Sequence, residues 1–199
     1  MTKRDPATLS SQNIVEFLED IFLRRGNEEY LGEPVTMAQH MLQGAHFAEE
    51  ANEPEEIVVS ALLHDIGHFT SEFGMFSMQD TEDKYHEEAG AELLGKFFPD
   101  IVTDCVRYHV AAKRYLCATD QDYFAKLSSA SVHSLNLQGG PMNREEVAEF
   151  EKNPNLKAIV RVRIYDDKGK VADFNPQPFS HYREIVQRVV DRHINEKIH

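Results

Sequence analysis

The sequence has few cysteines and no long apolar segment. Cys105 and Cys117 are its two cysteines, and their spacing is not the Cys-x-x-Cys of a structural zinc site. No apolar run approaches the roughly 20 residues of a membrane-spanning helix. The opening stretch MTKRDPATLSSQN lacks the apolar core of a signal peptide. We therefore expect a cytoplasmic protein whose thiols are reduced.

The sequence also lacks an excess of basic residues. It has 21 Lys and Arg against 34 Asp and Glu, which gives a formal net charge of -13. Nucleic acids and anionic membranes bind cationic surfaces, so we expect neither as a partner. Nothing in the sequence indicates an obligatory protein partner. An anionic small molecule would need a local cluster of Lys or Arg at its site.

Strand pairs, internal repeats and domain linkers are not indicated either. Apolar residues recur at helical spacing instead, and 199 residues with 41% hydrophobic content suffice for one core. We predict an all-α protein, a single helical bundle over residues 1–199 whose first ten residues form a loose arm. The predicted helices lie at about 14–25, 35–51, 54–65, 83–98, 100–116, 120–135, 143–153, 155–167 and 180–194, and 70–83 is predicted to be a loop.

The stretch SALLHDIGHF, residues 60–69, places His64, Asp65 and His68 in an apolar run. Burying ionisable groups costs free energy unless hydrogen bonds or a metal compensate. Other predicted helices carry further ligand-type residues, namely His40, His86, His109 and Asp166. A lone histidine in a helix is usually a satisfied core or surface residue, but the adjacent His-Asp pair is less easily explained that way.

The number of these side chains favours two metal ions. Four imidazoles and two carboxylates exceed one closed site, and they fit two metals bridged by a carboxylate. Asp65 is the natural bridge because it adjoins His64. Nitrogen and oxygen ligands without sulfur suit iron, manganese or zinc, and they leave positions open for a reactant.

Two cations share helix faces with these ligands. Lys113 follows His109 by four residues, and Arg163 precedes Asp166 by three. His68 likewise follows His64 by four residues, so it can face the same site. Lys and Arg there would form a local anion pocket, although a solvated helix surface is the alternative.

The order of His40, the His64-Asp65 pair and Asp166 resembles the HD-domain superfamily of helical metalloproteins. His86 and His109 match its dinuclear members. Most of these are phosphohydrolases, and a minority are mixed-valent di-iron oxygenases. The stretches EYLGEP, HVAAKRYL, LSSAS and QGGPM resemble the oxygenase branch that cleaves hydroxyalkylphosphonates, over about residues 28–185.

This resemblance implies a site with two irons, Fe(II) and Fe(III), and with O2 as co-substrate. The first iron would take His40, His64, Asp65 and Asp166, and the second would take Asp65, His86 and His109. The implied catalytic residues are Tyr30, which fills an open metal position, Glu33, which contacts the substrate nitrogen, and His68. The substrate-binding residues would be Tyr30, Glu33, His68, Lys113, Ser131 and Arg163.

The implied reaction is oxidative cleavage of the carbon–phosphorus bond of (R)-1-hydroxy-2-(trimethylammonio)ethylphosphonate to glycine betaine and phosphate. A quaternary ammonium favours aromatic faces and a carboxylate, for which Tyr30, Phe69 and Glu33 are the candidates. Three alternatives stay open. They are the same reaction on 2-amino-1-hydroxyethylphosphonate giving glycine, a metal-dependent phosphohydrolase, and a ligand-sensing HD domain without catalysis.

Overall fold

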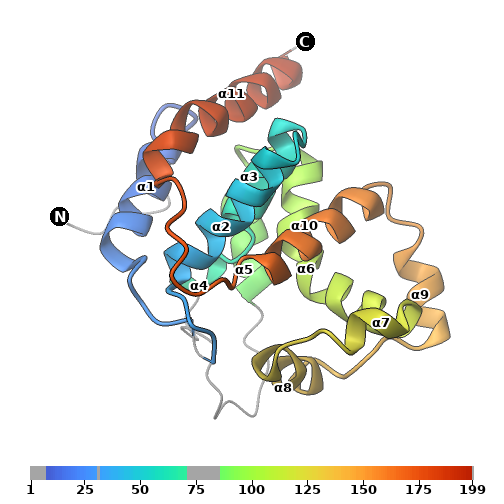
Figure 1. Cartoon of the computed structure of the whole chain (residues 1–199). Coiled ribbons are helices and arrows are strands. Elements are labelled where there is room, and N and C mark those ends of the chain that lie inside the picture. Colours follow the sequence, from blue (N-terminus) through green and yellow to red (C-terminus); the bar gives the residue numbers. More distant parts are fainter. Residues whose placement is uncertain (1–7, 31, 71–85, 199) are drawn as a thin grey trace.

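The computed structural model describes residues 8–30, 32–70 and 86–198, and these form α-helices joined by turns and loops (Figure 1). Within these ranges the β structure amounts to one isolated bridge between Glu29 and Thr36. The all-α prediction is therefore confirmed. The helices are α1 (Ile14–Arg25), α2 (Met37–Glu50), α3 (Glu55–Leu63), α4 (Gly67–Thr70), α5 (His86–Leu94), α6 (Asp100–Thr119), α7 (Gln121–Phe124), α8 (Ser129–Leu137), α9 (Arg144–Phe150), α10 (Leu156–Lys168) and α11 (Phe179–Ile198).

Local sequence explains where α1 ends and α2 begins. Thr36 and Gln39 form a capping box, in which the Thr36 hydroxyl accepts from the Gln39 N–H at 3.2 Å and the Gln39 side chain accepts from the Thr36 N–H at 2.9 Å. Gly26 follows α1, and a Cβ there would lie 2.6 Å from Ala38 Cβ. Glycine is thus needed for the close approach of the two helices.

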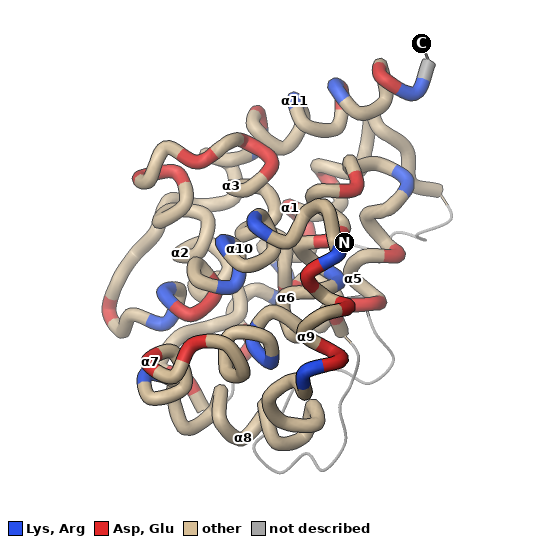
Figure 2. The backbone as a smooth tube through the Cα atoms, turned by 90° about the vertical axis from the view of Figure 1, so that its right-hand side faces the viewer, with Lys and Arg blue, Asp and Glu red and all other residues tan. Residues whose placement is uncertain are grey.

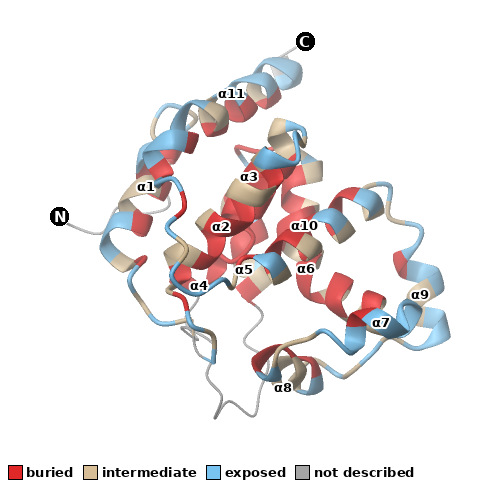
Figure 3. Ribbon diagram, viewed as in Figure 1, coloured by how far each residue is buried: buried red, intermediate tan, exposed pale blue. Residues whose placement is uncertain are grey.

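The core lies between α2, α3, α6 and α10, which pack on one another, while α5 packs on α6 and α4 (Figure 3). These helices are apolar on their facing sides, as amphipathic helices of a bundle must be. The helices α1 and α11 contact each other and close the core over α3, with Tyr182 and Val186 fully buried. Leu9, in the predicted arm, also packs against the core, whereas residues 1–7 lie outside the described part.

Charged residues of both signs are spread over the helices (Figure 2). None of the helices in the described ranges is long and apolar enough to cross a membrane. Most of the charged residues in the described ranges are exposed, and the few that are buried are described below.

Several predicted boundaries are wrong. The predicted helix over residues 120–135 is two helices, because Asp120 caps α7 and the Ser128 hydroxyl accepts from the Ser131 N–H to start α8 anew. The helix expected to include His64 and Asp65 ends at Leu63, with His64 as its C-cap. Helix α5 ends at residue 94 rather than 98, and α11 continues to residue 198. Most of the predicted loop at 70–83 lies outside the described residues.

Candidate active site

Six ligand-type side chains from distant parts of the chain meet in the core. They are all buried, and they come from α2, from the turn after α3, and from α5, α6 and α10. His40 Nε2 lies 3.0 Å from His64 Nε2, and His86 Nε2 lies 3.1 Å from His109 Nε2. The predicted ligands that converge here are His40, His64, Asp65, His86, His109 and Asp166.

The two histidine pairs cannot both be ordinary hydrogen bonds between neutral rings. The Nδ1 atoms of His40, His64 and His109 lie 3.0, 2.8 and 2.7 Å from the carbonyl oxygens of Gly169, Ala61 and Val106. A neutral ring that donates from Nδ1 has only a lone pair on Nε2. In the His40–His64 pair, two such lone pairs would therefore face each other at 3.0 Å unless a metal ion or an added proton lies between them.

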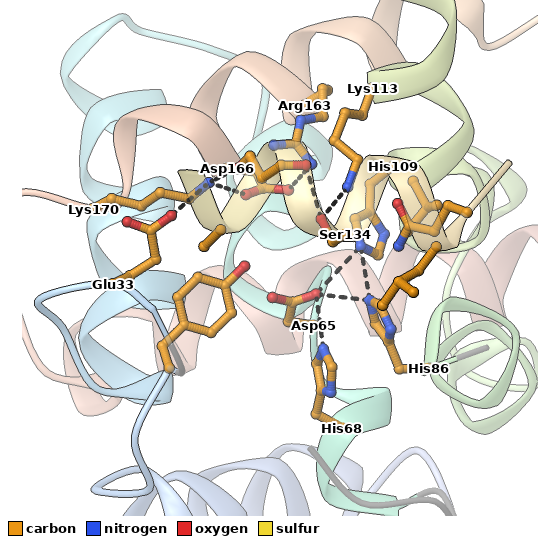
Figure 4. A pocket seen from close by; sticks show the side chains of 16 residues that line it. Glu33, Asp65, His68, His86, His109, Lys113, Ser134, Arg163, Asp166 and Lys170 are labelled. Carbon is orange, nitrogen blue, oxygen red and sulfur yellow. Dashed lines mark hydrogen bonds and ion pairs between the residues drawn. The ribbon is translucent and has the colours of Figure 1, made fainter. Parts of the chain in front are cut away.

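The Asp65 carboxylate lies between the pairs, with one oxygen toward each. Figure 4 shows the side that faces His86 and His109. Its Oδ2 is 3.4 Å from the Nε2 atoms of both His40 and His64, and its Oδ1 is 3.2 Å from those of both His86 and His109. Asp65 Oδ2 and Asp166 Oδ1 have no hydrogen-bond partner among the residues that the structure describes. Buried carboxylate oxygens without partners are costly, and a bound cation would satisfy them.

The pKa shifts in this cluster follow from burial and mutual charge. Burial alone would lower the pKa of His64, but the Asp65 and Asp166 carboxylates raise it to about 9. Burial would raise the pKa of Asp65, but the surrounding histidines hold it well below its usual range. The cluster without metal therefore favours an imidazolium where a metal ion would otherwise lie. The donor set fits two cations that share Asp65.

His68 offers one more nitrogen near the second pair. Its ring stacks on that of His86 with centroids 3.8 Å apart, and its Nε2 is 3.8 Å from Asp65 Oδ1. His109 Nε2 is closer to that oxygen, at 3.2 Å, but Asp65, His68 and His86 also lie close enough together to hold a metal ion. Burial and the charge of His86 hold the pKa of His68 well below its usual range, which keeps the ring neutral.

A cavity opens beside the cluster, and its wall holds the predicted cations. Lys113 Nζ donates to Ser134 Oγ at 2.6 Å, and burial, with the nearby Arg163 charge, lowers the pKa of Lys113 to about 7. Arg163 pairs with Asp166 at 2.7 Å and also with Asp167. The predicted residues that line this cavity are Tyr30, Glu33, Asp65, His68, His86, His109, Lys113, Ser131, Arg163 and Asp166.

Tyr30 and Glu33 reach the same cavity from the segment before α2. The Tyr30 ring stacks on His40 with centroids 4.1 Å apart and planes 13° apart, and burial, together with the Asp65 charge, raises the pKa of Tyr30. Glu33 Oε1 accepts a hydrogen bond of 2.5 Å from Ser128 Oγ. Phe69 does not line this cavity among the residues that the structure describes. Its ring lies 5.1 Å from the Arg25 guanidinium carbon.

The chain is similar to known proteins over most of its length. The HD-domain family model matches residues 37–127. The 1-hydroxy-2-(trimethylamino)ethyl phosphonate dioxygenase (glycine-betaine-forming) of Leisingera caerulea is 68% identical over 194 residues, which cover 98% of this chain and 99% of that protein. The chain belongs to the HD-domain family of phosphonate dioxygenases.

Two further relatives are more distant. The hydroxymethylphosphonate dioxygenase of Gimesia maris is 41% identical over 165 residues, 82% of each chain. An uncharacterised protein of Acanthamoeba polyphaga mimivirus is 32% identical over 179 residues, 86% of this chain and 80% of that one. The HD-domain match includes five of the six ligand-type residues, and Asp166 lies beyond it. Membership of this family supports a bound metal and O2 as a reactant.

Sequence reasoning missed several polar residues around the cavity. Lys170 lines it, four residues after Asp166, and that spacing was a signal that the sequence contained. Ser128 and Ser134 are joined to Glu33 and Lys113 only by tertiary contacts. Two residues that hold Arg163 were also missed: Asp167, and Tyr123, whose hydroxyl accepts from Arg163 Nε at 3.0 Å.

Proposed function

We propose that this protein cleaves the carbon–phosphorus bond of (R)-1-hydroxy-2-(trimethylammonio)ethylphosphonate with O2, giving glycine betaine and phosphate. The observation that carries the proposal is the Asp65 carboxylate, whose two oxygens face separate histidine pairs beside a cavity lined by cations. The name of the Leisingera relative supports the choice of substrate.

The proposed cofactor is a mixed-valent pair of irons, Fe(II) and Fe(III). Its first ion would be held by His40, His64, Asp65 and Asp166, and its second by Asp65, His86 and His109. When bound, the pair would supply the binding and reduction of O2. Three of these histidines are already oriented for this role. His40, His64 and His109 each donate from Nδ1 to a backbone carbonyl, which directs Nε2 into the cluster.

The cavity residues would bind and orient the substrate. Lys113, Arg163, Ser131 and His68 are proposed to hold the phosphonate, because they surround the cavity with donors and two cationic groups. Glu33, fixed by Ser128, would receive the positive nitrogen. Such orientation in a buried site can supply much of the rate of an enzyme.

Tyr30 is proposed to occupy an open metal position until the substrate arrives. Its ring already stacks on His40 at the edge of the cavity. A buried hydroxyl with a raised pKa needs a cation beside it to become a phenolate. Loss of that contact on substrate binding would free the position for a reactant.

The proposed reaction balances without an organic cofactor. C1 of the substrate carries one hydrogen, one hydroxyl and the phosphonate, and it is oxidised by four electrons to a carboxylate while O2 is reduced. The carbon–phosphorus bond breaks, one new C–O bond and one new P–O bond form, and one proton is released with the phosphate. No external reductant is required.

The test is aerobic and anaerobic turnover by the iron-loaded protein. We expect O2 consumption equal to phosphate release, and no phosphate without O2. Phosphate release that is independent of O2 would favour the phosphohydrolase alternative. The absence of both O2 consumption and phosphate release would favour a ligand-sensing domain. Parallel reactions with the trimethylammonio and primary-amine substrates, followed by NMR, should give glycine betaine faster than glycine.

The cytoplasmic location, the single domain and the lack of an obligatory protein partner stay predictions.

A further inference from the structure

The cavity holds a third cation, Lys170, which lies beside Glu33 and Asp166 (Figure 4). Lys170 Nζ donates to Ser131 Oγ at 3.0 Å, on the side proposed for the phosphonate. It lies 3.7 Å from Glu33 Oε1, on the side proposed for the substrate nitrogen. It is also 3.4 Å from Asp167 Oδ1 and 3.9 Å from Asp166 Oδ1.

The backbone around Lys170 is held on both sides. The carbonyl of Gly169 lies 3.0 Å from His40 Nδ1, and a Cβ at Gly169 would lie 2.6 Å from the His40 carbonyl oxygen. On the other side, the buried Gln43 amide donates to the Val171 carbonyl at 3.0 Å and accepts from its N–H at 2.9 Å. The position of Lys170 is therefore built into the site rather than set by a freely moving surface chain.

Lys113 and Lys170 differ in their partners. Lys113 forms no ion pair within 4.0 Å with any carboxylate that the structure describes, so its charge is available to an incoming anion. Lys170 has three carboxylates within that distance. Its charge is already balanced, and Glu33 has no other described ion-pair partner. The side chains of Lys170 and Glu33 are only 11% and 7% exposed, so water screens their attraction weakly.

We propose that Lys170 determines the charge selectivity of the cavity by acting as the internal cation of Glu33. This inference rests on the proposed function, in which Glu33 receives a substrate ammonium. A substrate that carries this ammonium must displace Lys170 from Glu33, and Lys170 then keeps Ser131 and Asp167 as partners. A phosphonate without nitrogen leaves the Lys170–Glu33 pair intact, so no buried carboxylate faces the substrate uncompensated.

The test compares two phosphonates in anaerobic calorimetry of the iron-loaded protein, with kcat and KM measured in air. One is the trimethylammonio substrate, and the other is hydroxymethylphosphonate, which has no nitrogen. In Lys170→Gln, we expect Kd and KM to fall for the first and rise for the second. The ratio of the two affinities should change roughly tenfold to a hundredfold, because the substrate ammonium no longer competes with the Lys170 ammonium for Glu33. Lys170→Arg, which keeps the charge, should resemble the wild type.

The double variant separates this role from others. When Glu33→Gln is present, Lys170→Gln should no longer change the ratio. Equal weakening of both ligands by Lys170→Gln would show a phosphonate-binding role and overturn the proposal, as would an unchanged ratio. Loss of iron in Lys170→Gln would overturn it too, because Lys170 would then act on Asp166. If the wild type binds both phosphonates but turns over neither, the proposed function fails while the calorimetric ratio still tests Lys170.

Discussion

Replacing Lys113 by methionine should weaken phosphonate binding and stabilise the fold. Lys113 is 3% exposed, and its one described hydrogen-bond partner is Ser134. Burial, with the Arg163 charge, lowers its pKa from the usual 10.5 to about 7, so the folded state disfavours the charged amine. Methionine keeps most of the aliphatic length and removes the charge.

The size of the effect on stability follows from this pKa. At about 1.4 kcal/mol per pKa unit, the buried amine lowers the free energy of unfolding by roughly 4 kcal/mol at pH 7. The lost hydrogen bond to Ser134 offsets about 1 kcal/mol. Metal-free Lys113→Met should therefore unfold at higher urea, by about 3 kcal/mol at pH 7. The unfolded chain binds more protons between pH 7 and 10.5, so the wild type gains stability with rising pH. Near pH 10.5 only the loss of the Ser134 hydrogen bond remains, and the wild type should be the more stable by about 1 kcal/mol.

The effect on binding has the opposite sign. Removing one partner of a buried charge pair costs about 2 to 5 kcal/mol, so Kd for the phosphonate should rise at least ~30-fold. Urea unfolding followed by circular dichroism measures the stability, anaerobic calorimetry measures Kd for the phosphonate, and metal analysis measures the iron content. Lys126→Met, an exposed site on the turn after α7, makes the same change in net charge and should alter none of them. Unchanged stability at pH 7, or loss of iron with unchanged phosphonate affinity, would refute the reasoning.

Three other changes test the metal cluster and the nitrogen end of the cavity. His64→Ala should abolish iron binding and O2-dependent phosphate release, and full activity by electrode and phosphate assay would disprove the di-iron assignment. Gly169→Ala should lower the melting temperature and the iron content together, because its Cβ would lie 2.6 Å from the His40 carbonyl; an unchanged iron content would show that the loop can shift freely. Ser128→Ala should raise KM for the trimethylammonio substrate by roughly tenfold through loss of the 2.5 Å hydrogen bond to Glu33, with a smaller change for hydroxymethylphosphonate; equal changes would contradict this role.

Interactions between near neighbours in the chain could be predicted from the sequence. The pairs His109–Lys113 and Arg163–Asp166 lie one helical turn apart, and the helical period alone places each pair on one face. The His64-Asp65 pair in an apolar run likewise indicated a buried site that needs compensation. Apart from Phe69, the predicted ligands and cavity residues are found around one point in the core, and their assigned roles await the experiments above.

The boundary between α7 and α8 shows why other features could not be predicted. Helical spacing continues through residues 120–135, and the competing signal is a single serine whose hydroxyl can either face solvent or cap a helix. Ser128 caps α8 and at the same time donates to Glu33, ninety-five residues earlier in the chain. Such a partner is chosen by packing, and no local pattern specifies it.

The sequence by itself determined the helical class, the ligand types and the two cations that lie one helical turn from a ligand, because each depends on residue chemistry at short spacing. The tertiary structure decided which oxygen of Asp65 faces which histidine pair, and it brought Lys170 between Glu33 and Ser131. The reason is physical. Electrostatic interactions in a buried site depend on distances between side chains from separate helices, and those distances exist only after the helices have packed.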